Sequence, residues 1–252
     1  MSRTVAIIQA RMSSRRFPGK VLVPLAGAPV LEHVVNRVRR ASRVDELMVA
    51  TSVALADDAI VEWARSFGVL CIRGSESDVL SRFALAATVY DASVVVRVTA
   101  DCPLLSPMVL DAVVEAREAA SADYASNTIS RRFPHGLDVE CLTRSILEAA
   151  AAGATLAEER EHVTPYVYNR PSQFRIASVT IPDDWSWLRW TLDTQEDLRL
   201  LHALFAAAPS AMNPMSDWRS TAAIFASSPV LRAANESAIA AKDTAACAIP
   251  LK

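Results

Sequence analysis

Short apolar runs alternate with amphipathic segments over the first 120 residues, and this alternation limits the chain to few folds. The runs at 4–10, 46–52, 68–74 and 92–100 are strand-like, and the last, ASVVVRVTA, is apolar enough to be a central strand. The segments 29–41, 57–67, 77–92 and 107–120 place apolar residues at helical spacing. This alternation predicts an α/β fold with a three-layer, mainly parallel sheet, in which ligands bind at the carboxyl ends of the strands.

The pattern weakens after about residue 122. The runs ADYASN, GLDVECL and FRIASVTI are strand-like, with helices near 143–152 and 157–169, and LRWTLDTQEDLRLLHALF adds a strand that leads into a helix capped by Thr194. We expect one domain over 1–207, with a small α+β insertion at about 122–180 that serves a second substrate or dimer contacts. Residues 208–252 are rich in Ala, Ser and Pro, which predicts a weakly structured tail with one or two short helices.

Cysteine spacing and hydropathy exclude several classes of protein. The chain has four cysteines, which are far apart and form no CxxC pair: Cys71, Cys102, Cys141 and Cys247. Neither a zinc site nor a disulfide framework is therefore indicated. No apolar run reaches about 18 residues, and the run near the start is too short for a signal peptide. We expect a cytoplasmic protein without membrane insertion.

The loop after the first strand, QARMSSRRFPGK at 9–20, is strongly basic. Residues 1–43 carry nine Lys and Arg side chains against Glu32, whereas the whole chain has a formal net charge of −2. This asymmetry suggests an anionic ligand, although the helical cations Arg37, Arg39 and Arg40 are expected to face solvent. Arginine, lysine and free backbone N–H groups hold phosphate well, but neither GxxxxGK[ST] nor GxGxxG is present. Only three lysines occur beside 23 arginines. Lys20 therefore stands either at a position that needs a compact charge or there by chance.

Two aspartates follow strand-like runs further along the chain. Asp101 comes just past the most apolar run, in VVVRVTADCPLL, and Asp193 lies in RWTLDTQEDL. Each carboxylate has two interpretations: a ligand of Mg²⁺ on a triphosphate, or the N-cap of the following helix. Taken alone, Asp193 fits a cap better than a ligand.

Together these segments resemble the cytidylyltransferases that activate sugars as CMP derivatives. The resemblance is to relatives of the CMP-KDO and CMP-sialate synthetases, and most closely to the branch called spore-coat polysaccharide biosynthesis protein F (SpsF)-like. The matching pieces span residues 4 to about 205 in the order of the family: IIQARMSSRRFPGKVL, GSESDVLSR, RVTADCPL, HGLDVE, REHVTPYVY and WTLDTQEDL. The resemblance implies a Rossmann-like nucleotide-diphospho-sugar transferase fold, CTP as donor, a sugar acceptor, Mg²⁺ as cofactor and a homodimer.

The resemblance also implies roles for individual residues. The triphosphate loop would comprise Arg11, Ser14, Arg15 and Lys20, and the metal carboxylates would be Asp101 and Asp193. The base or ribose would lie near Ser75, Asp78 and Arg82, with Thr99 also on the nucleotide. The acceptor would lie near Gly136, Asp138, Glu140, Arg160, Glu161 and His162. Catalysis is expected to depend most on Arg15, Lys20 and Asp101.

The chain departs from its better-known relatives at three positions. Val21 stands where CMP-sialate synthetases have Asn, and Thr99 where many relatives have Gln, so the choice of base stays open. Thr191 stands where some relatives carry a further carboxylate, which implies fewer metal ligands here.

The implied reaction is in-line attack of a sugar hydroxyl on the α-phosphorus of CTP, with pyrophosphate leaving. A proton acceptor is optional, with His162 or Glu140 as candidates, and His162 can instead be a surface histidine paired with Glu158. A keto-sugar acid as acceptor calls for an arginine, for which Arg131, Arg132 and Arg160 are available.

Two other functions stay open. One is a nucleotide-sugar-dependent glycosyltransferase with Asp138-Val139-Glu140 as a metal motif, and the other is a non-catalytic nucleotide-binding partner in polysaccharide assembly. Nucleic-acid binding is not expected, because aromatic residues do not alternate with the cations.

Overall fold

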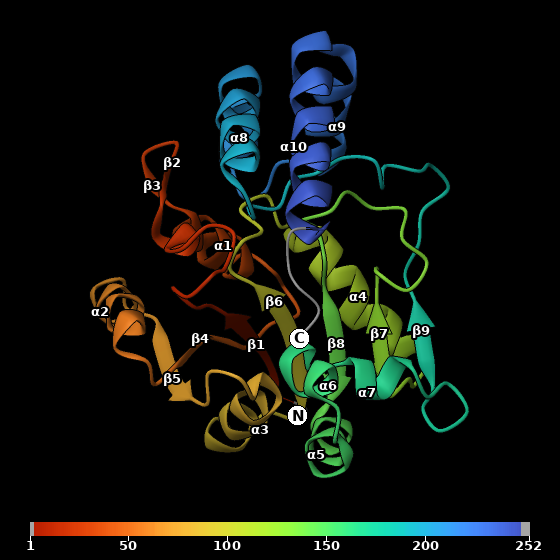
Figure 1. The fold of residues 1–252 in the computed structure, drawn as a ribbon. Coiled ribbons are helices and arrows are strands. Elements are labelled where there is room, and N and C mark those ends of the chain that lie inside the picture. The colour runs from red at the N-terminus through yellow and green to blue at the C-terminus, as the bar shows by residue number, and fades with distance from the viewer. Residues whose placement is uncertain (1–2, 248–252) are drawn as a thin grey trace.

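A seven-stranded sheet forms the centre of the computed structural model, which describes residues 3–247 (Figure 1). The strand order is β5-β4-β1-β6-β8-β7-β9, and in the described part of the chain only β8 of this sheet runs antiparallel to its neighbours. The strands of the sheet are β1 (Thr4–Gln9), β4 (Glu46–Ser52), β5 (Leu70–Gly74), β6 (Val94–Thr99), β7 (Tyr124–Ser126), β8 (Glu140–Thr143) and β9 (Ile176–Ser178). The predicted three-layer, mainly parallel α/β architecture is confirmed.

Helices connect the strands and cover both faces of the sheet. The helices are α1 (Val30–Val38), α2 (Asp58–Ser66), α3 (Val79–Val89), α4 (Pro107–Ala119), α5 (Arg144–Gly153), α6 (Ala157–His162), α7 (Pro165–Tyr168), α8 (Gln195–Ala207), α9 (Trp218–Ser227) and α10 (Pro229–Cys247). Short 3₁₀ turns occur at Lys20–Leu22, Leu55–Asp57 and Pro209–Met212, and a small hairpin pairs β2 (Pro24–Leu25) with β3 (Ala28–Pro29). None of the helices within residues 3–247 is both long and apolar enough to cross a membrane.

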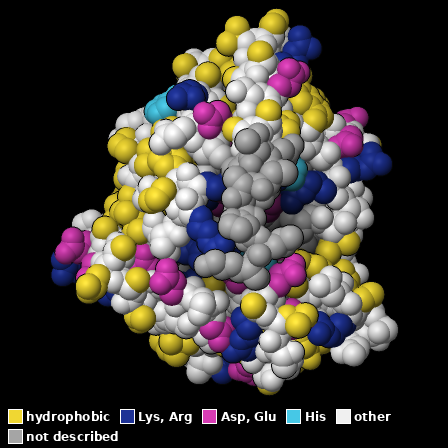
Figure 2. All heavy atoms as spheres, viewed as in Figure 1, with side chains coloured by type: hydrophobic (Ala, Val, Ile, Leu, Met, Phe, Trp, Pro, Cys, Tyr) yellow, Lys and Arg dark blue, Asp and Glu magenta, His cyan; other side chains and the backbone are white. Residues whose placement is uncertain are grey.

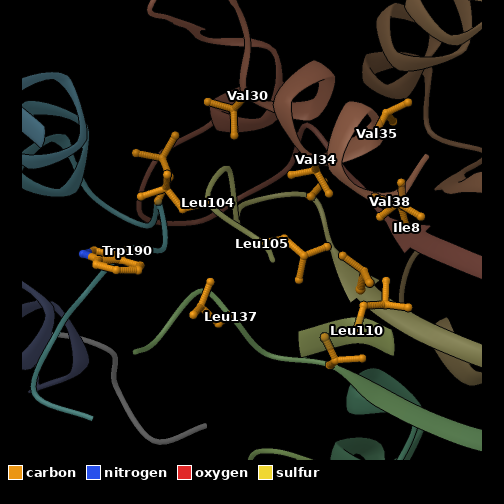
Figure 3. Packing of buried hydrophobic residues seen from close by; sticks show 14 of the residues in the cluster. Ile8, Val30, Val34, Val35, Val38, Leu104, Leu105, Leu110, Leu137 and Trp190 are labelled. Atoms are coloured by element: carbon orange, nitrogen blue, oxygen red, sulfur yellow. The ribbon is translucent and has the colours of Figure 1, made fainter. Parts of the chain in front are cut away.

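Two hydrophobic cores lie on opposite faces of the sheet, because successive side chains of a strand point to opposite sides. Ala6 and Ile8 of β1 belong to the core that α1, α2 and α4 cover, and Figure 3 shows the α1 valines together with Leu104 and Leu105 in that core. Val5 and Ile7 belong to the core that α3 and α5 cover. Burial on both faces explains why β1 and β6 read as continuous apolar runs.

The C-terminal segment differs from the weakly structured tail that the sequence predicts. Two helices do follow residue 208, but α10 is 19 residues long and packs against α8 (Figure 1). Trp218 and Phe225 of α9 are buried in the main core, where Phe225 contacts the rings of Trp187 and Trp190. Residues 248–252 of the predicted tail lie outside the described residues.

Two local expectations were wrong. The run before Asp193 is not a strand, since its only sheet-like contact in the described chain is an isolated bridge between His135 and Arg189. Arg37 does not face solvent: it is 4% exposed and donates hydrogen bonds to the backbone carbonyls of Leu105 and Ala211. Arginine can be buried on an otherwise apolar helix face when carbonyl groups accept its N–H donors.

Candidate active site

The basic loop leads away from the carboxyl end of β1 and forms one wall of a cavity of about 440 Å³. Figure 2 shows Lys and Arg side chains near the middle of the face that it draws. The cavity is lined by Gln9, Arg11, Ser14, Arg15, Arg16, Lys20, Val21, Arg97, Thr99, Ala100, Asp101, Glu161, His162 and Asp193. The predicted loop residues and both predicted carboxylates therefore meet in one cavity at the carboxyl ends of β1 and β6.

A buried carboxylate fixes the beginning of this loop. Asp57, which is fully buried, accepts hydrogen bonds from the backbone N–H of Met12 at 2.7 Å and of Ser52 at 3.0 Å, and from the Thr51 hydroxyl at 2.9 Å. Burial alone would raise the pKa of Asp57, but these donors lower it below its usual value. The sequence gives no sign of this role, because Asp57 there marks only the start of the helix predicted at 57–67.

Gly19 closes the loop at its other end. Its backbone N–H donates to the carbonyl oxygen of Met12 at 2.9 Å, and its φ of 76° is a left-handed conformation that glycine adopts without steric cost. Lys20 follows directly and starts a 3₁₀ turn, so its side chain is held at the cavity.

Lys20 lies between the two aspartates. Its Nζ is 2.6 Å from Asp101 Oδ2 and 2.7 Å from Asp193 Oδ1, and the lysine is 8% exposed. Burial alone would lower the pKa of Lys20, but the two carboxylates raise it above its usual value. The lysine is therefore a buried, charged group that keeps two like charges apart.

Asp193 has two more cationic partners. Arg16 lies 3.1 Å and Arg189 3.0 Å from its second oxygen. Burial raises the pKa of Asp193, but Lys20, Arg16 and Arg189 together lower it to about 2. Arg16 thus contacts the proposed metal carboxylate directly, and Arg189 is held in turn by Asp197 at 2.6 Å.

Neither aspartate caps a helix. Ser106 is the N-cap of α4, and Thr194 is the N-cap of α8 in a reciprocal capping box with Asp197. The Thr194 cap is as predicted from the sequence, and it removes the competing interpretation of Asp193. Both carboxylates instead line the cavity, where Lys20 pairs with them.

The donor set suits Mg²⁺ that is shared with a phosphate. No group of three or more His, Cys, Asp or Glu side chains fit to hold a metal occurs among the described residues, so a site made of protein ligands alone is not present there. Mg²⁺ in nucleotide sites commonly uses one or two carboxylates, with water and substrate phosphates as further ligands. Asp101 and Asp193 meet that requirement.

A second cavity, of about 590 Å³, adjoins the first and shares Arg97, Thr99 and His162 with it. Its other lining residues are Thr128, Ile129, Arg131, Asp138, Glu140, Thr164 and Tyr168. Three predicted acceptor residues, Asp138, Glu140 and His162, therefore line it. Glu161 lines the first cavity instead, where it pairs with Arg11 at 3.2 Å.

The backbone next to His162, which lines both cavities, is strained. Val163 has a φ of 73° between α6 and α7, which breaks the single helix that the sequence predicts over 157–169. A β-branched residue in this region costs of order 1–3 kcal/mol, and such strain is found most often at functional sites. The break turns His162 toward both cavities and lets the Thr164 hydroxyl donate to Glu140. His162 has no side-chain hydrogen bond or ion pair within residues 3–247, so the alternative pairing with Glu158 is not observed.

Five predicted site residues do not line either cavity. They are Ser75, Asp78, Arg82, Gly136 and Arg160. Asp78 caps α3 and accepts from Arg160 Nε at 3.1 Å, and Gly136 lies against the Trp190 backbone, where a Cβ would come within 2.6 Å. Arg82 is 1% exposed, and none of its three guanidinium nitrogens has a hydrogen-bond partner among the described residues.

The chain is similar to proteins of one family. Residues 5–218 match the family model described as cytidylyltransferase. The spore coat polysaccharide biosynthesis protein SpsF of Bacillus subtilis (strain 168) is 34% identical, over 82% of this chain and 88% of that protein. A 3-deoxy-manno-octulosonate cytidylyltransferase of Anaeromyxobacter sp. (strain Fw109-5) is 31% identical, over 83% of this chain and 99% of the relative. The solved structure of a cytidylyltransferase from Leptospira borgpetersenii serovar Hardjo-bovis (strain JB197) superposes with a TM-score of 0.85 at 29% identity, over 92% of this chain and 97% of the other.

Proposed function

The chain belongs to the cytidylyltransferase family, and we propose that it transfers CMP from CTP to a hydroxyl group of a keto-sugar acid, for a surface polysaccharide or glycan. The hydroxyl oxygen bonds to the α-phosphorus, the bond from that phosphorus to the bridging oxygen breaks, pyrophosphate leaves, and the hydroxyl proton is lost. The observation that carries the proposal is the meeting of a basic loop with two carboxylates in one cavity. The names of the relatives, a spore coat polysaccharide protein and a 3-deoxy-manno-octulosonate cytidylyltransferase, support the class of acceptor.

The loop would hold the triphosphate. Arg15 is exposed at the cavity and has no hydrogen bond or ion pair with any described residue, so it can turn to a phosphate without losing a partner. Arg11, Ser14 and Lys20 line the same wall. Cations placed around the leaving pyrophosphate stabilise the charge that develops there, and phosphoryl-type transfer is catalysed mainly in this way.

Asp101 and Asp193 would hold Mg²⁺ together with the phosphates. The ion supplies positive charge beside the α-phosphate. Because Lys20 lies between these two carboxylates, we propose that the triphosphate draws Lys20 away from them and thereby leaves both free. Lys20 then changes partners within the same cavity.

The cytosine and ribose would lie toward α3. Ser75, Asp78 and Arg82 cluster at the start of that helix, and the partnerless guanidinium of Arg82 is the strongest support for a polar ligand there. Thr99 lines the cavity nearer to Asp101, whose Oδ1 accepts from the Thr99 hydroxyl at 2.6 Å.

The acceptor would occupy the second cavity, with Gly136 and Arg160 in supporting positions outside its wall. His162 lies between the two cavities and has an unpartnered imidazole, so it is our candidate for taking the hydroxyl proton. Glu140 is a weaker candidate, because it is buried and accepts from Tyr124, Thr164 and Arg97.

We further propose a homodimer that acts in the cytoplasm, where CTP is made and used. The dimer would use the part of the chain at about 122–180, whose edge strand β9 pairs only with β7 in the described sheet. Size-exclusion chromatography with light scattering tests this, and a monomer at micromolar concentration would contradict it.

Pyrophosphate release tests the reaction. The protein is incubated with Mg²⁺, 3-deoxy-manno-octulosonate and each of CTP, ATP, GTP and UTP, and a CMP-sugar is expected with CTP. Asp101→Asn should lower the rate at least 100-fold. Sugar transfer from a UDP- or GDP-sugar without pyrophosphate release would instead show a glycosyltransferase, and no turnover in either assay would favour a binding partner in polysaccharide assembly.

A further inference from the structure

Arg97 is a charged residue in the centre of an otherwise apolar strand. It lies on β6, in the run VVVRVT, and its side chain is 13% exposed. The residue lines both cavities, which only Thr99 and His162 also do among the residues described as lining them. Arg97 therefore lies where the nucleotide cavity and the acceptor cavity meet.

The guanidinium is fixed in place but is not fully used. Its Nη1 donates to Glu140, and its Nη2 donates to Gln9 Oε1 at 3.1 Å. Its Nε has no partner within the described residues. Because a guanidinium carries five N–H donors, this arginine can still bind an anion.

Glu140 has no such spare capacity. It is 7% exposed, and its oxygens accept from the Tyr124 hydroxyl at 2.7 Å and from the Thr164 hydroxyl, besides Arg97. Burial alone would lower the pKa of Arg97, but Glu140 raises it. Glu140 thus keeps Arg97 charged and oriented, which makes it a positioning residue.

The chemistry of the acceptor says where its carboxylate must lie. In the cyclic form of a 2-keto sugar acid, the anomeric hydroxyl and the carboxylate are attached to the same carbon atom. If that hydroxyl attacks the α-phosphorus, the carboxylate enters the site beside the reacting oxygen. The cation that recognises it must therefore lie where the two cavities meet, and not at the far wall of the acceptor cavity.

The three arginines that the sequence offered for this role lie elsewhere. Arg131 lines only the acceptor cavity, and its two terminal nitrogens bind both oxygens of Asp138 at 2.7 and 2.8 Å. Arg132 is exposed and donates to the carbonyl of Pro182, and Arg160 is bound to Asp78. None of them lines both cavities.

We propose that Arg97 is the specificity-determining residue that binds the acceptor's carboxylate beside the transferred phosphate, so that the enzyme selects 2-keto sugar acids over neutral sugars. This proposal rests on the proposed function. Two parallel N–H···O bonds from one guanidinium to a carboxylate give both affinity and orientation.

Selectivity between a matched pair of acceptors tests the assignment. The acceptors are 3-deoxy-manno-octulosonate and its analogue with a hydroxymethyl group in place of the carboxylate. The variants are Arg97→Gln combined with Glu140→Gln, which leaves no unpaired buried charge, and Arg97→Lys. Arg132→Gln is the matched control, because it removes an arginine that lines neither cavity. The readouts are kcat/KM for each acceptor and the Kd for CTP.

The wild type should prefer the acid, and the double variant should lower that preference about 10- to 150-fold, mainly through the KM of the acid. Arg97→Lys should keep part of the preference, and Arg132→Gln all of it. The Kd for CTP should change less than about twofold. An unchanged preference in the double variant, an equal loss on both acceptors, or a wild type that prefers the neutral analogue would overturn the role of Arg97. A wild type that makes no product from CTP with either acceptor would overturn the proposed function itself, and the wild type alone shows this.

Discussion

Replacing Lys20 with alanine removes the cation that separates Asp101 from Asp193. The two carboxylate oxygens that contact Nζ lie at most about 5 Å apart, since each is within 2.7 Å of the same atom. At an effective dielectric of about 20, two unit charges at that separation repel by about 3 kcal/mol. Arg16 and Arg189 still face Asp193 in the variant, so we expect the free energy of unfolding at pH 7 to fall by about 2–3 kcal/mol.

Magnesium should reverse part of this loss. Without Lys20, the two carboxylates become an open divalent site even in the absence of nucleotide. If the site binds Mg²⁺ with a Kd of about 1 mM, then 10 mM Mg²⁺ restores about 1.4 kcal/mol. The wild type should gain nothing from Mg²⁺ alone, because Lys20 occupies the space between the carboxylates. Urea unfolding with 10 mM Mg²⁺ and with chelator measures both effects.

Lys242→Ala is the matched control, because Lys242 has no hydrogen bond or ion pair with a described side chain. Its stability should be within about 0.5 kcal/mol of the wild type in both conditions. The reasoning is refuted if Lys20→Ala is as stable as the wild type in chelator, or if Mg²⁺ stabilises both proteins equally.

Three further predictions concern stability. Burial and Arg131 lower the pKa of His135 to about 4, so the unfolded chain binds the imidazole proton more tightly than the folded protein does. The free energy of unfolding should therefore be highest above about pH 6.5 and fall by about 1–3 kcal/mol as the pH drops toward 4. In urea unfolding between pH 7.5 and 4.5, His135→Gln should make the free energy of unfolding depend less on pH. An unaltered pH dependence would count against this role of His135. Arg82→Met should raise the stability of the nucleotide-free protein by about 1–3 kcal/mol while weakening CTP binding at least tenfold; a loss of stability would mean that the guanidinium is paired after all. Phe225→Ala should lower the free energy of unfolding by about 3–5 kcal/mol, whereas Val230→Ala, at an exposed position, should lower it by less than about 0.5 kcal/mol. Equal losses in the two variants would contradict the packing of α9.

Local periodicity was enough to predict the parallel strands β1, β4, β5 and β6. The strand predicted at 46–52 is observed with the same bounds, and the helix predicted at 107–120 is observed over Pro107–Ala119. These elements are buried on both faces or amphipathic, so each leaves its own pattern in the sequence. Asp101 was found for a related reason, because it follows directly on an apolar strand and ligands bind at the carboxyl ends of such strands. Asp193 also follows an apolar run, although that run is not a strand of the sheet.

The C-terminal helices were underestimated because their stability comes from distant contacts. Alanine is the best helix former, so an Ala-rich segment needs few large side chains to become a helix once it can pack. Phe225 packs on Trp187 and Trp190, residues that lie far back in the sequence. The composition of the segment carries no sign of these distant partners.

The site residues that the sequence missed act through partners far along the chain. Asp57, which follows β4, accepts from the backbone N–H of Met12, and Arg97 on β6 is paired with Glu140 on the adjacent strand β8. One feature of the sequence does mark Arg97: it is a single charge within a buried strand. Burial of a guanidinium is costly unless a partner or a ligand compensates the charge, so such a residue has either one or the other. The resemblance assigned Lys20 to the triphosphate loop, and only the structure shows that Lys20 also pairs with both aspartates.

Calorimetric titration of the protein with CTP, ATP, GTP and UTP in the presence of Mg²⁺ tests the central claim most directly. We predict that CTP binds with a micromolar Kd and at least tenfold more tightly than the other three nucleotides, and that Lys20→Ala weakens this binding more than Lys242→Ala does. Equal binding of all four nucleotides, or no binding of CTP, would contradict the assignment of this cavity to CTP.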